Sequence, residues 1–159
     1  MLTFAMYKSE FGFIKLAYQN ETIYFLKKIE TDEIDFGIKT EFTDFVFSQL
    51  QEYFCGKRKT FDFKYELQGT DFQKKVWNAL CDIPYGETRT YKDIAIAIGN
   101  LKACRAVGLA NNKNPITIVV PCHRVIGSSG KLVGYAGGLE MKQKLLHLEN
   151  PEKNLIKNY

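Results

Sequence analysis

At residues 116–126 the chain carries Ile116-Thr117-Ile118-Val119-Val120-Pro121-Cys122-His123-Arg124-Val125-Ile126. Four of the first five residues are β-branched aliphatics, and such a run predicts a short buried strand. Pro121 has no N–H to donate to a sheet, so it is predicted to end that strand. We therefore expect the strand to deliver Cys122 to a fixed point at the edge of a core.

Cys122 is followed at once by an imidazole and a guanidinium. A thiol held beside a basic ring is the usual arrangement of a sulfur nucleophile, because the thiolate is the reactive form. The alternative is a buried cysteine that only packs, which is the commoner fate of a cysteine. His123 and Arg124 favour the nucleophile, since a packed thiol needs no basic neighbours.

The composition describes an ordinary globular protein. Its 159 residues are 45% hydrophobic and 25% charged, enough for one domain or two small ones. No signal h-region or membrane-length apolar run is present in the sequence, so we expect a protein without a membrane partner. The four cysteines form no CxxC pair and only two histidines accompany them, so we expect no metal site. Unpaired thiols are typical of a reducing, cytoplasmic compartment.

Charge divides the chain into two halves. Residues 1–70 carry 9 Lys+Arg against 11 Asp+Glu, a net charge of −2, and residues 71–159 carry 13 against 7, a net charge of +6. The basic half indicates a polyanion partner, although many basic faces are only solvated.

The first half has the pattern of a small antiparallel domain. Residues 11–17 and 22–29 are rich in aromatic and β-branched residues on either side of a polar turn, which predicts a hairpin. Residues 31–40 form a charged connection, and apolar spacing over 41–55 predicts a helix. Alternation over 61–67 predicts a further strand. This half shows no catalytic residues, so we expect it to support the second half.

The second half has helix signals at three places. Thr70 and Gln73 have capping-box spacing, which predicts a helix start after Thr70. Thr90 is predicted to cap a helix over 91–98, and small residues follow within a predicted helix over 102–111. Two short helices joined by a tight turn resemble a helix-turn-helix unit. Small side chains there suit close approach to a nucleic-acid groove and tight helix packing equally well, so both remain open.

The end of the chain adds a loop and a helix. Residues 134–138 are glycine-dense and can follow a flat ligand closely. A final helix is predicted over 139–148, with Glu149 at its end, before a polar tail at 151–159.

Three motifs resemble the O6-methylguanine-DNA methyltransferases, the suicide DNA-repair alkyltransferases. They are Pro121-Cys122-His123-Arg124-Val125-Ile126, the segment Arg105-Ala106-Val107-Gly108 with Asn114-Pro115, and Gly134-Tyr135-Ala136-Gly137-Gly138. The resemblance covers residues 71–149, and the first half is similar only in architecture. It implies an α+β fold, with a ribonuclease H-like N-terminal domain over 1–68, a C-terminal winged helix-turn-helix domain over 69–150 and a tail over 151–159.

The resemblance also implies the chemistry. Cys122 would take a methyl or larger alkyl group from O6 of guanine, and His123 would draw the thiol proton through a water. Glu149 would hold the imidazolium, and Asn114 would complete the hydrogen-bond network. Tyr91 would stand at the flipped base or its phosphate. The thioether product is inert, so each chain would act once, without a cofactor.

The same resemblance implies the binding residues. The helix at 102–111 would enter the minor groove of double-stranded DNA that contains O6-alkylguanine, and Arg105 would fill the space left by the flipped base. The remaining residues implied in substrate or DNA binding are Ala106, Gly108, Arg124, Val125, Tyr135 and Ala136. Some relatives have serine at the position of Ala136, so a hydroxyl contact to the lesion is missing here. We expect a monomer, and cooperative binding and activity on O4-alkylthymine stay open.

Two other classes of protein fit parts of the pattern. A Cys-His hydrolase would use the same thiol and imidazole with Asn114, but it would turn over many times and would need an oxyanion site. A winged-helix regulator without catalysis would tolerate loss of Cys122.

Overall fold

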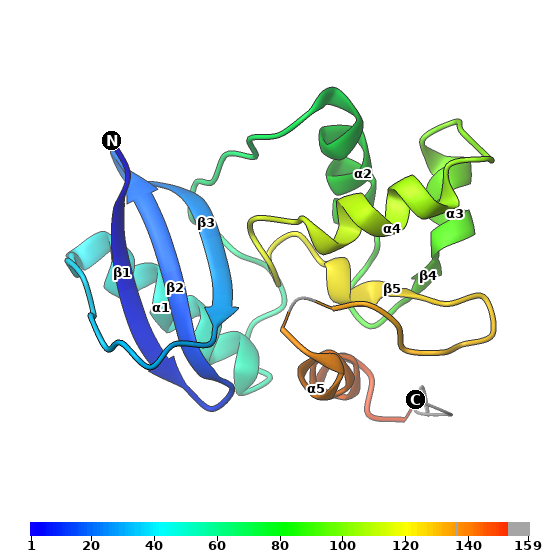
Figure 1. Ribbon diagram of the computed structural model, residues 1–159. Coiled ribbons are helices and arrows are strands. Elements are labelled where there is room, and N and C mark those ends of the chain that lie inside the picture. The colour runs from blue at the N-terminus through cyan, green and yellow to red at the C-terminus, as the bar shows by residue number, and fades with distance from the viewer. Residues whose placement is uncertain (136, 153–159) are drawn as a thin grey trace. The chain divides into compact units, whose positions relative to one another are not determined.

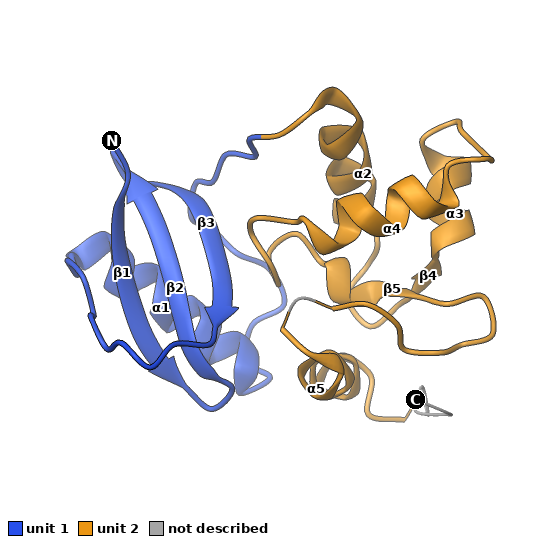
Figure 2. Ribbon diagram, in the orientation of Figure 1, with its two compact units in different colours: residues 1–68 blue, residues 69–159 orange. Residues whose placement is uncertain are grey.

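The computed structural model describes residues 1–135 and 137–152 (Figure 1). The chain divides into two compact units, residues 1–68 and 69–159 (Figure 2). The first unit is built on an antiparallel sheet and the second is mainly helical. This two-part α+β organisation agrees with the predicted fold class.

The first unit is a three-stranded sheet covered on one face by a helix (Figure 1). Its strands, in the spatial order β1-β2-β3, are β1 (Thr3–Ser9), β2 (Gly12–Gln19) and β3 (Thr22–Ile29). The expected hairpin is present as β2 and β3, and β1 was not predicted. Asn20 and Glu21 have φ values of 50° and 57°, so the turn between β2 and β3 takes the left-handed conformation that suits the sheet twist.

Helix α1 (Glu41–Phe54) packs against β1 through its aromatic side chains. The rings of Tyr7 and Phe47 stack with centroids 4.4 Å apart, and the Tyr7 hydroxyl donates to Thr43 Oγ1 at 2.8 Å. Thr40 closes the start of α1 with a capping box. The helix therefore begins where its side-chain cap allows and is held by buried aromatic surface.

The strand predicted over 61–67 is wrong. The segment makes one isolated bridge, between Ile23 and Tyr65, and two backbone hydrogen bonds to Ile23. Phe61 instead packs its ring 5.7 Å from that of Tyr53 on α1. Alternating apolar residues are thus buried here by contact with a helix, and a strand ladder is not needed to bury them.

The second unit starts with α2 (Asp71–Cys81), β4 (Arg89–Thr90), α3 (Tyr91–Ala97) and α4 (Cys104–Asn112). Thr70 and Thr90 form the capping boxes that the sequence predicted. Gly99, with φ 76°, follows the end of α3, and α3 and α4 pack as the helix-turn-helix. The indole N–H of Trp77 donates to the Ala110 carbonyl at 2.8 Å, which fixes α4 on α2.

The rest of the unit consists of a short 3₁₀ helix η1 (Cys122–Arg124), β5 (Val125–Ile126) and α5 (Leu139–Glu149). Strand β5 pairs in parallel with β4 over two residues. No helix in the described part of the chain is both long and apolar enough to cross a bilayer.

The buried strand predicted over 116–120 is also wrong. Ile118 has a φ of 74°, and the Val120 N–H donates to the Ile116 carbonyl at 3.0 Å, so the chain reverses there. Asn114 holds the reversal closed, because its Nδ2 donates to the Val120 carbonyl at 2.7 Å and its Oδ1 accepts from Ile116 N at 3.0 Å. The apolar run is buried as predicted, but it folds as a turn.

Candidate active site

Cys122 is the first residue of η1 and is only 3% exposed. The turn at 116–120 precedes it, and β5 follows η1 directly, so its backbone is fixed on both sides. From α4, Asn111 Nδ2 approaches the Cys122 carbonyl at 3.4 Å. The thiol therefore occupies a rigid and enclosed position, as the sequence argument required.

His123 and Glu149 meet in the interior. The imidazole is fully buried, and its Nε2 lies 2.8 Å from Oε2 of Glu149, the last residue of α5. Nδ1 of His123 has no hydrogen-bond partner in the described structure. Burial lowers the pKa of His123, and the raising effect of Glu149 does not offset it. The ring is therefore neutral at pH 7, with its proton on Nε2 and a basic lone pair on Nδ1.

Glu149 is ionised in this setting. Burial acts to raise its pKa, but the hydrogen bonds and charges of His123 and Arg124 outweigh that effect and hold the pKa far below its usual range. Arg124 donates from Nε to Oε1 at 2.8 Å and from Nη2 to Oε2 at 3.0 Å. Arg124 was predicted among the residues that bind substrate or DNA; the structure instead turns its guanidinium inward onto a carboxylate.

Asn114 lies apart from this pair. Both ends of its buried side-chain amide bond to the backbone of the 116–120 turn, and no hydrogen bond joins it to His123 in the described residues. In the structure Asn114 therefore stabilises the 116–120 turn, which leads to Cys122.

Tyr91 connects three parts of the second unit. It begins α3, its hydroxyl donates to the Val133 carbonyl at 2.9 Å, and a Cβ added to Gly108 of α4 would meet its ring at 3.8 Å. Burial, and then the charge of Cys122, raise the pKa of Tyr91. That distance is an ordinary van der Waals contact, so Gly108 lies against the Tyr91 ring without being required to be glycine by it.

Tyr135 belongs to the glycine-dense segment 134–138. A Cβ on Gly137 would fall 2.7 Å from the Tyr135 ring and 2.8 Å from Met141 Sδ, so only glycine fits there. Burial, followed by the charge of Cys122, raises the pKa of Tyr135 well above its usual value. The charge of Cys122 thus acts on Tyr135, and the predicted role of Tyr135 as a wall of the lesion pocket stays a prediction. Ala136, the other predicted residue of this loop, lies outside the described residues.

One residue near the thiol was missed by the sequence argument. Lys142 of α5 is fully buried, and its Nζ donates to the carbonyls of Val125 at 2.5 Å and Val133 at 2.9 Å. Burial lowers its pKa to about 8, against the raising effect of the Cys122 charge. Val125, predicted as a pocket wall, is thus fixed by this lysine. A lysine inside an apolar helical pattern was the available signal, since buried lysines are rare.

The outer face of α4 carries the remaining predicted residues. Arg105 and Ala106 are exposed there, while Val107 and Ala110 face the core. The helix thus exposes an arginine beside a small residue, and their contacts with DNA stay a prediction.

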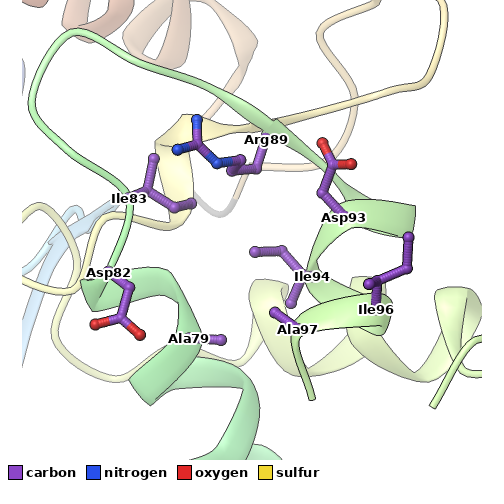
Figure 3. A pocket seen from close by; sticks show the side chains of 8 residues that line it. All are labelled: Ala79, Asp82, Ile83, Arg89, Asp93, Ile94, Ile96 and Ala97. Atoms are coloured by element: carbon purple, nitrogen blue, oxygen red, sulfur yellow. The ribbon is translucent and has the colours of Figure 1, made fainter. Parts of the chain in front are cut away.

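A hollow of about 420 Å³ lies elsewhere in the unit, beside α2 and α3 (Figure 3). Arg89, Asp82 and Asp93 supply its charged side chains. Its lining contains neither a thiol nor an imidazole, so the chemistry of Cys122 takes place outside it. Among the described residues, no group of three or more His, Cys, Asp or Glu could hold a metal ion.

Comparison with known proteins identifies both units. Residues 71–151 match the model for the DNA binding domain of 6-O-methylguanine DNA methyltransferase, and residues 3–67 match that for its ribonuclease-like domain. The chain belongs to this family.

Individual members of the family cover the chain. A methylated-DNA–protein-cysteine methyltransferase of Methanosarcina acetivorans is 53% identical over 92% of this chain and 97% of its own length. The relative from Methanosarcina barkeri is 66% identical over 67% of this chain, and the match spans 66% of that relative. The crystal structure of Mycobacterium tuberculosis OGT in complex with DNA has 45% identity and a TM-score of 0.83, over 93% of this chain and 92% of that one.

For a member of the 6-O-methylguanine DNA methyltransferase family, the geometry is coherent. The thiol and the imidazole come from η1, and the carboxylate comes from the end of α5. Helix α4 of the helix-turn-helix is joined to η1 by the hydrogen bond from the Asn111 side chain to the Cys122 carbonyl. The residues implied by the resemblance that are described all lie in the second unit, within the segment matched by the DNA binding domain.

Proposed function

We propose that this chain repairs double-stranded DNA by transferring an alkyl group from O6 of guanine to Sγ of Cys122. The names of its relatives and the DNA-bound M. tuberculosis structure support the reaction and the partner. The observation that carries the assignment is the buried His123–Glu149 pair beside Cys122. It leaves a neutral imidazole with one free lone pair, the form a general base needs.

The reaction balances with these groups alone. His123 Nδ1 takes the thiol proton through a water, and the resulting thiolate attacks the carbon attached to O6. The S–C bond forms as the C–O6 bond breaks, and the electron pair stays on the guanine, whose N1 then takes up, through water, the proton that His123 had accepted. Glu149 stabilises the imidazolium while it exists.

The base must leave the helix before the thiol can reach it. Cys122 is 3% exposed and η1 does not project from the surface, so a stacked guanine is out of reach. We propose that α4 enters the minor groove, that Arg105 occupies the vacated stack and that Ala106 and Gly108 allow close approach. Tyr91, Val125, Tyr135 and Ala136 would then surround the flipped base.

Minor-groove contact carries little sequence information, so binding to undamaged DNA should be nonspecific and salt-sensitive. Lesions arise in any sequence, and such binding suits their repair. We further propose that the chain acts as a monomer in the cytoplasm, where its four cysteines, which form no disulfide, stay reduced.

Peptide mapping by mass spectrometry tests the proposal. After incubation with an excess of duplex that contains O6-methylguanine, we expect one methyl group per chain, located on the peptide that holds Cys122. Cys122→Ala should bind the same duplex and take up no methyl group. Transfer to another residue, or repeated turnover, would contradict the assignment, and the second result would favour a hydrolase.

A further inference from the structure

All three nitrogens of the Arg124 guanidinium donate hydrogen bonds within the protein. Its side chain is 9% exposed. Nε and Nη2 donate to the two carboxylate oxygens of Glu149, and Nη1 donates to the Ile83 carbonyl at 2.7 Å. A two-point contact of this kind matches the planar fork of arginine to a carboxylate and fixes the carboxylate plane. Arg124 therefore sets both where Glu149 lies and how it is turned.

The turn after α2 also contacts the Glu149 carboxylate. Gly86 N–H lies 3.4 Å from Glu149 Oε1, and the Asn150 amide donates to the Gly86 carbonyl at 3.1 Å. The Arg124 guanidinium also lies 5.7 Å from the centre of the Tyr85 ring. Groups from η1 and from this turn thus meet on the carboxylate at the end of α5, although only His123 takes part in the proposed proton transfer.

Together with His123, Arg124 lowers the pKa of Glu149 through its hydrogen bonds and its charge. Arginine does not lose its proton in proteins, so it is a permanent counter-charge, and an ionised carboxylate can only accept hydrogen bonds. His123 must then donate from Nε2, which leaves the lone pair on Nδ1. A protonated Glu149 could donate to Nε2 instead, and the imidazole proton would move to Nδ1, where no base remains.

We propose that Arg124 is a positioning residue, which keeps Glu149 an ionised acceptor and thereby fixes the His123 tautomer that can deprotonate Cys122. The inference rests on the proposed function and extends it. It also gives the arginine of this motif a task in proton transfer, where the resemblance implied a contact to substrate or DNA.

Other charged or titratable groups face the same pair. Lys142 lowers the pKa of His123 as Arg124 does, and Tyr85 and Tyr135 are affected by the charge of Glu149. Both tyrosines have raised pKa values, mainly through burial, and stay neutral at pH 7. Of these groups, only Arg124 contacts the oxygens of Glu149 with a fixed positive charge.

Nitrogen NMR of labelled histidine provides the direct measurement. The chain has only two histidines, so His147→Gln identifies the signals of His123. We expect the wild-type ring to be neutral with its proton on Nε2. Arg124→Met should move the proton partly or wholly to Nδ1, and Arg124→Lys, which keeps the charge without the fork, should restore Nε2–H.

The alkylation rate provides the second measurement. With free O6-benzylguanine as substrate, Arg124→Met should lower the rate of Cys122 benzylation roughly tenfold to a hundredfold at pH 7, since a general base contributes on the order of 10²–10⁴-fold. Arg124→Lys should recover part of that loss, and the pH profile of Arg124→Met should lose its imidazole step. Arg58→Met removes another arginine with two carboxylate partners, in the first unit, and should change neither measurement.

A folded Arg124→Met chain with the wild-type tautomer and pH profile would overturn the inference. If Arg124→Met does not fold, the comparison passes to Arg124→Lys and Glu149→Gln: the first should keep Nε2–H and the second should lose it. Identical tautomers in those two variants would also overturn it. Absence of alkyl transfer by the wild type would contradict the proposed function instead, while the tautomer measurement would still decide the role of Arg124.

Discussion

The side-chain amide of Asn111 donates to the backbone carbonyl of Cys122, with 3.4 Å between the two atoms. Asn111 lies on α4, the helix proposed to enter the groove, and Cys122 is the proposed alkyl acceptor. Both residues are almost fully buried. The helix proposed to bind DNA and the residue proposed to accept the alkyl group are therefore joined by a direct hydrogen bond.

Alkylation of Cys122 should destabilise the chain. The thiol is 3% exposed in a packed interior, and added carbon atoms at such a site cost about 1–3 kcal/mol. For a chain of this size, that corresponds to a decrease of roughly 2–12 °C in the unfolding temperature, and benzyl should have a larger effect than methyl. Because Asn111 transmits the strain to α4, affinity for DNA should fall as well. Calorimetry and DNA titration of the benzylated protein check this; unchanged values for both would contradict the coupling.

Arg105→Ala should separate repair of duplex DNA from chemistry on a free base. Arg105 is exposed on α4 and lies outside the His123–Glu149 network, so the reaction of Cys122 with free O6-benzylguanine should be unchanged. Repair of a duplex should slow by about tenfold or more, since extrusion costs a few kcal/mol that the arginine helps to offset. Lys102→Ala is the matched control: it removes an exposed positive charge just before α4, so it should reduce the salt dependence of DNA binding by about one unit at most and leave extrusion unchanged. Equal losses on duplex and free base would remove Arg105 from extrusion.

His123→Ala should slow alkylation of Cys122 by about 10²–10⁴-fold at neutral pH, the usual contribution of a general base. The variant depends on solvent to remove the thiol proton, so its rate should rise with pH and its profile should move upward. Stopped-flow measurement with free O6-benzylguanine between pH 5 and 10 gives the profile. His147→Ala, at the exposed histidine of α5, should leave it unchanged.

Stability should fall in acid in two stages. The pKa of His123 is below its usual 6.5 because of burial, so the unfolded chain binds the extra proton first and stability decreases as pH falls through 6.5. The pKa of Glu149 is depressed from 4.5, so its contribution is present above 4.5 and is lost as pH falls below that value. Urea unfolding between pH 3 and 7 should show a steeper loss below 4.5, and Glu149→Gln should abolish that steeper part. Parallel curves for the two proteins would contradict the assignment.

Lys142→Met should loosen the wall of the site. The substitution removes the lysine donor from both carbonyls; that of Val133 keeps the Tyr91 hydroxyl, whereas loss of the donor to the buried Val125 carbonyl should cost about 1–3 kcal/mol. We expect a lower urea midpoint and faster hydrogen exchange in residues 125–135. Lys144→Met, at an exposed position on the same helix, should change neither.

The elements that the sequence predicted well are those with local signals. Thr70 and Thr90 carry side-chain caps three residues from their partners, and the helices begin after them. The wrong predictions concern segments whose conformation depends on residues far away in the sequence. Whether residues 116–120 form a strand depends on a partner strand, which the fold does not supply, and on Asn114, which closes a turn there. The pairing of β4 with β5 joins residues far apart in sequence and has no local signature.

The site shows the same division. The adjacency of Cys122 and His123 is visible in the sequence, so a thiol and a base could be named as candidates from the sequence alone. Arg124 and Lys142 were misjudged or missed, because a basic side chain is expected at the surface unless a buried partner is known. Their partners, Glu149 and the carbonyl of Val125, are 25 and 17 residues away along the chain.

The deep position of Cys122 has a consequence for the lifetime of an unused molecule. Cys55 and Cys81 are exposed and Cys104 is partly so, whereas the sulfur that can act only once is enclosed. Burial should therefore protect the sulfur of Cys122 from small oxidants and general electrophiles better than the exposed thiols of Cys55 and Cys81 are protected. A protein that can accept only one alkyl group would thus keep its acceptor thiol unreacted until an alkylated guanine binds.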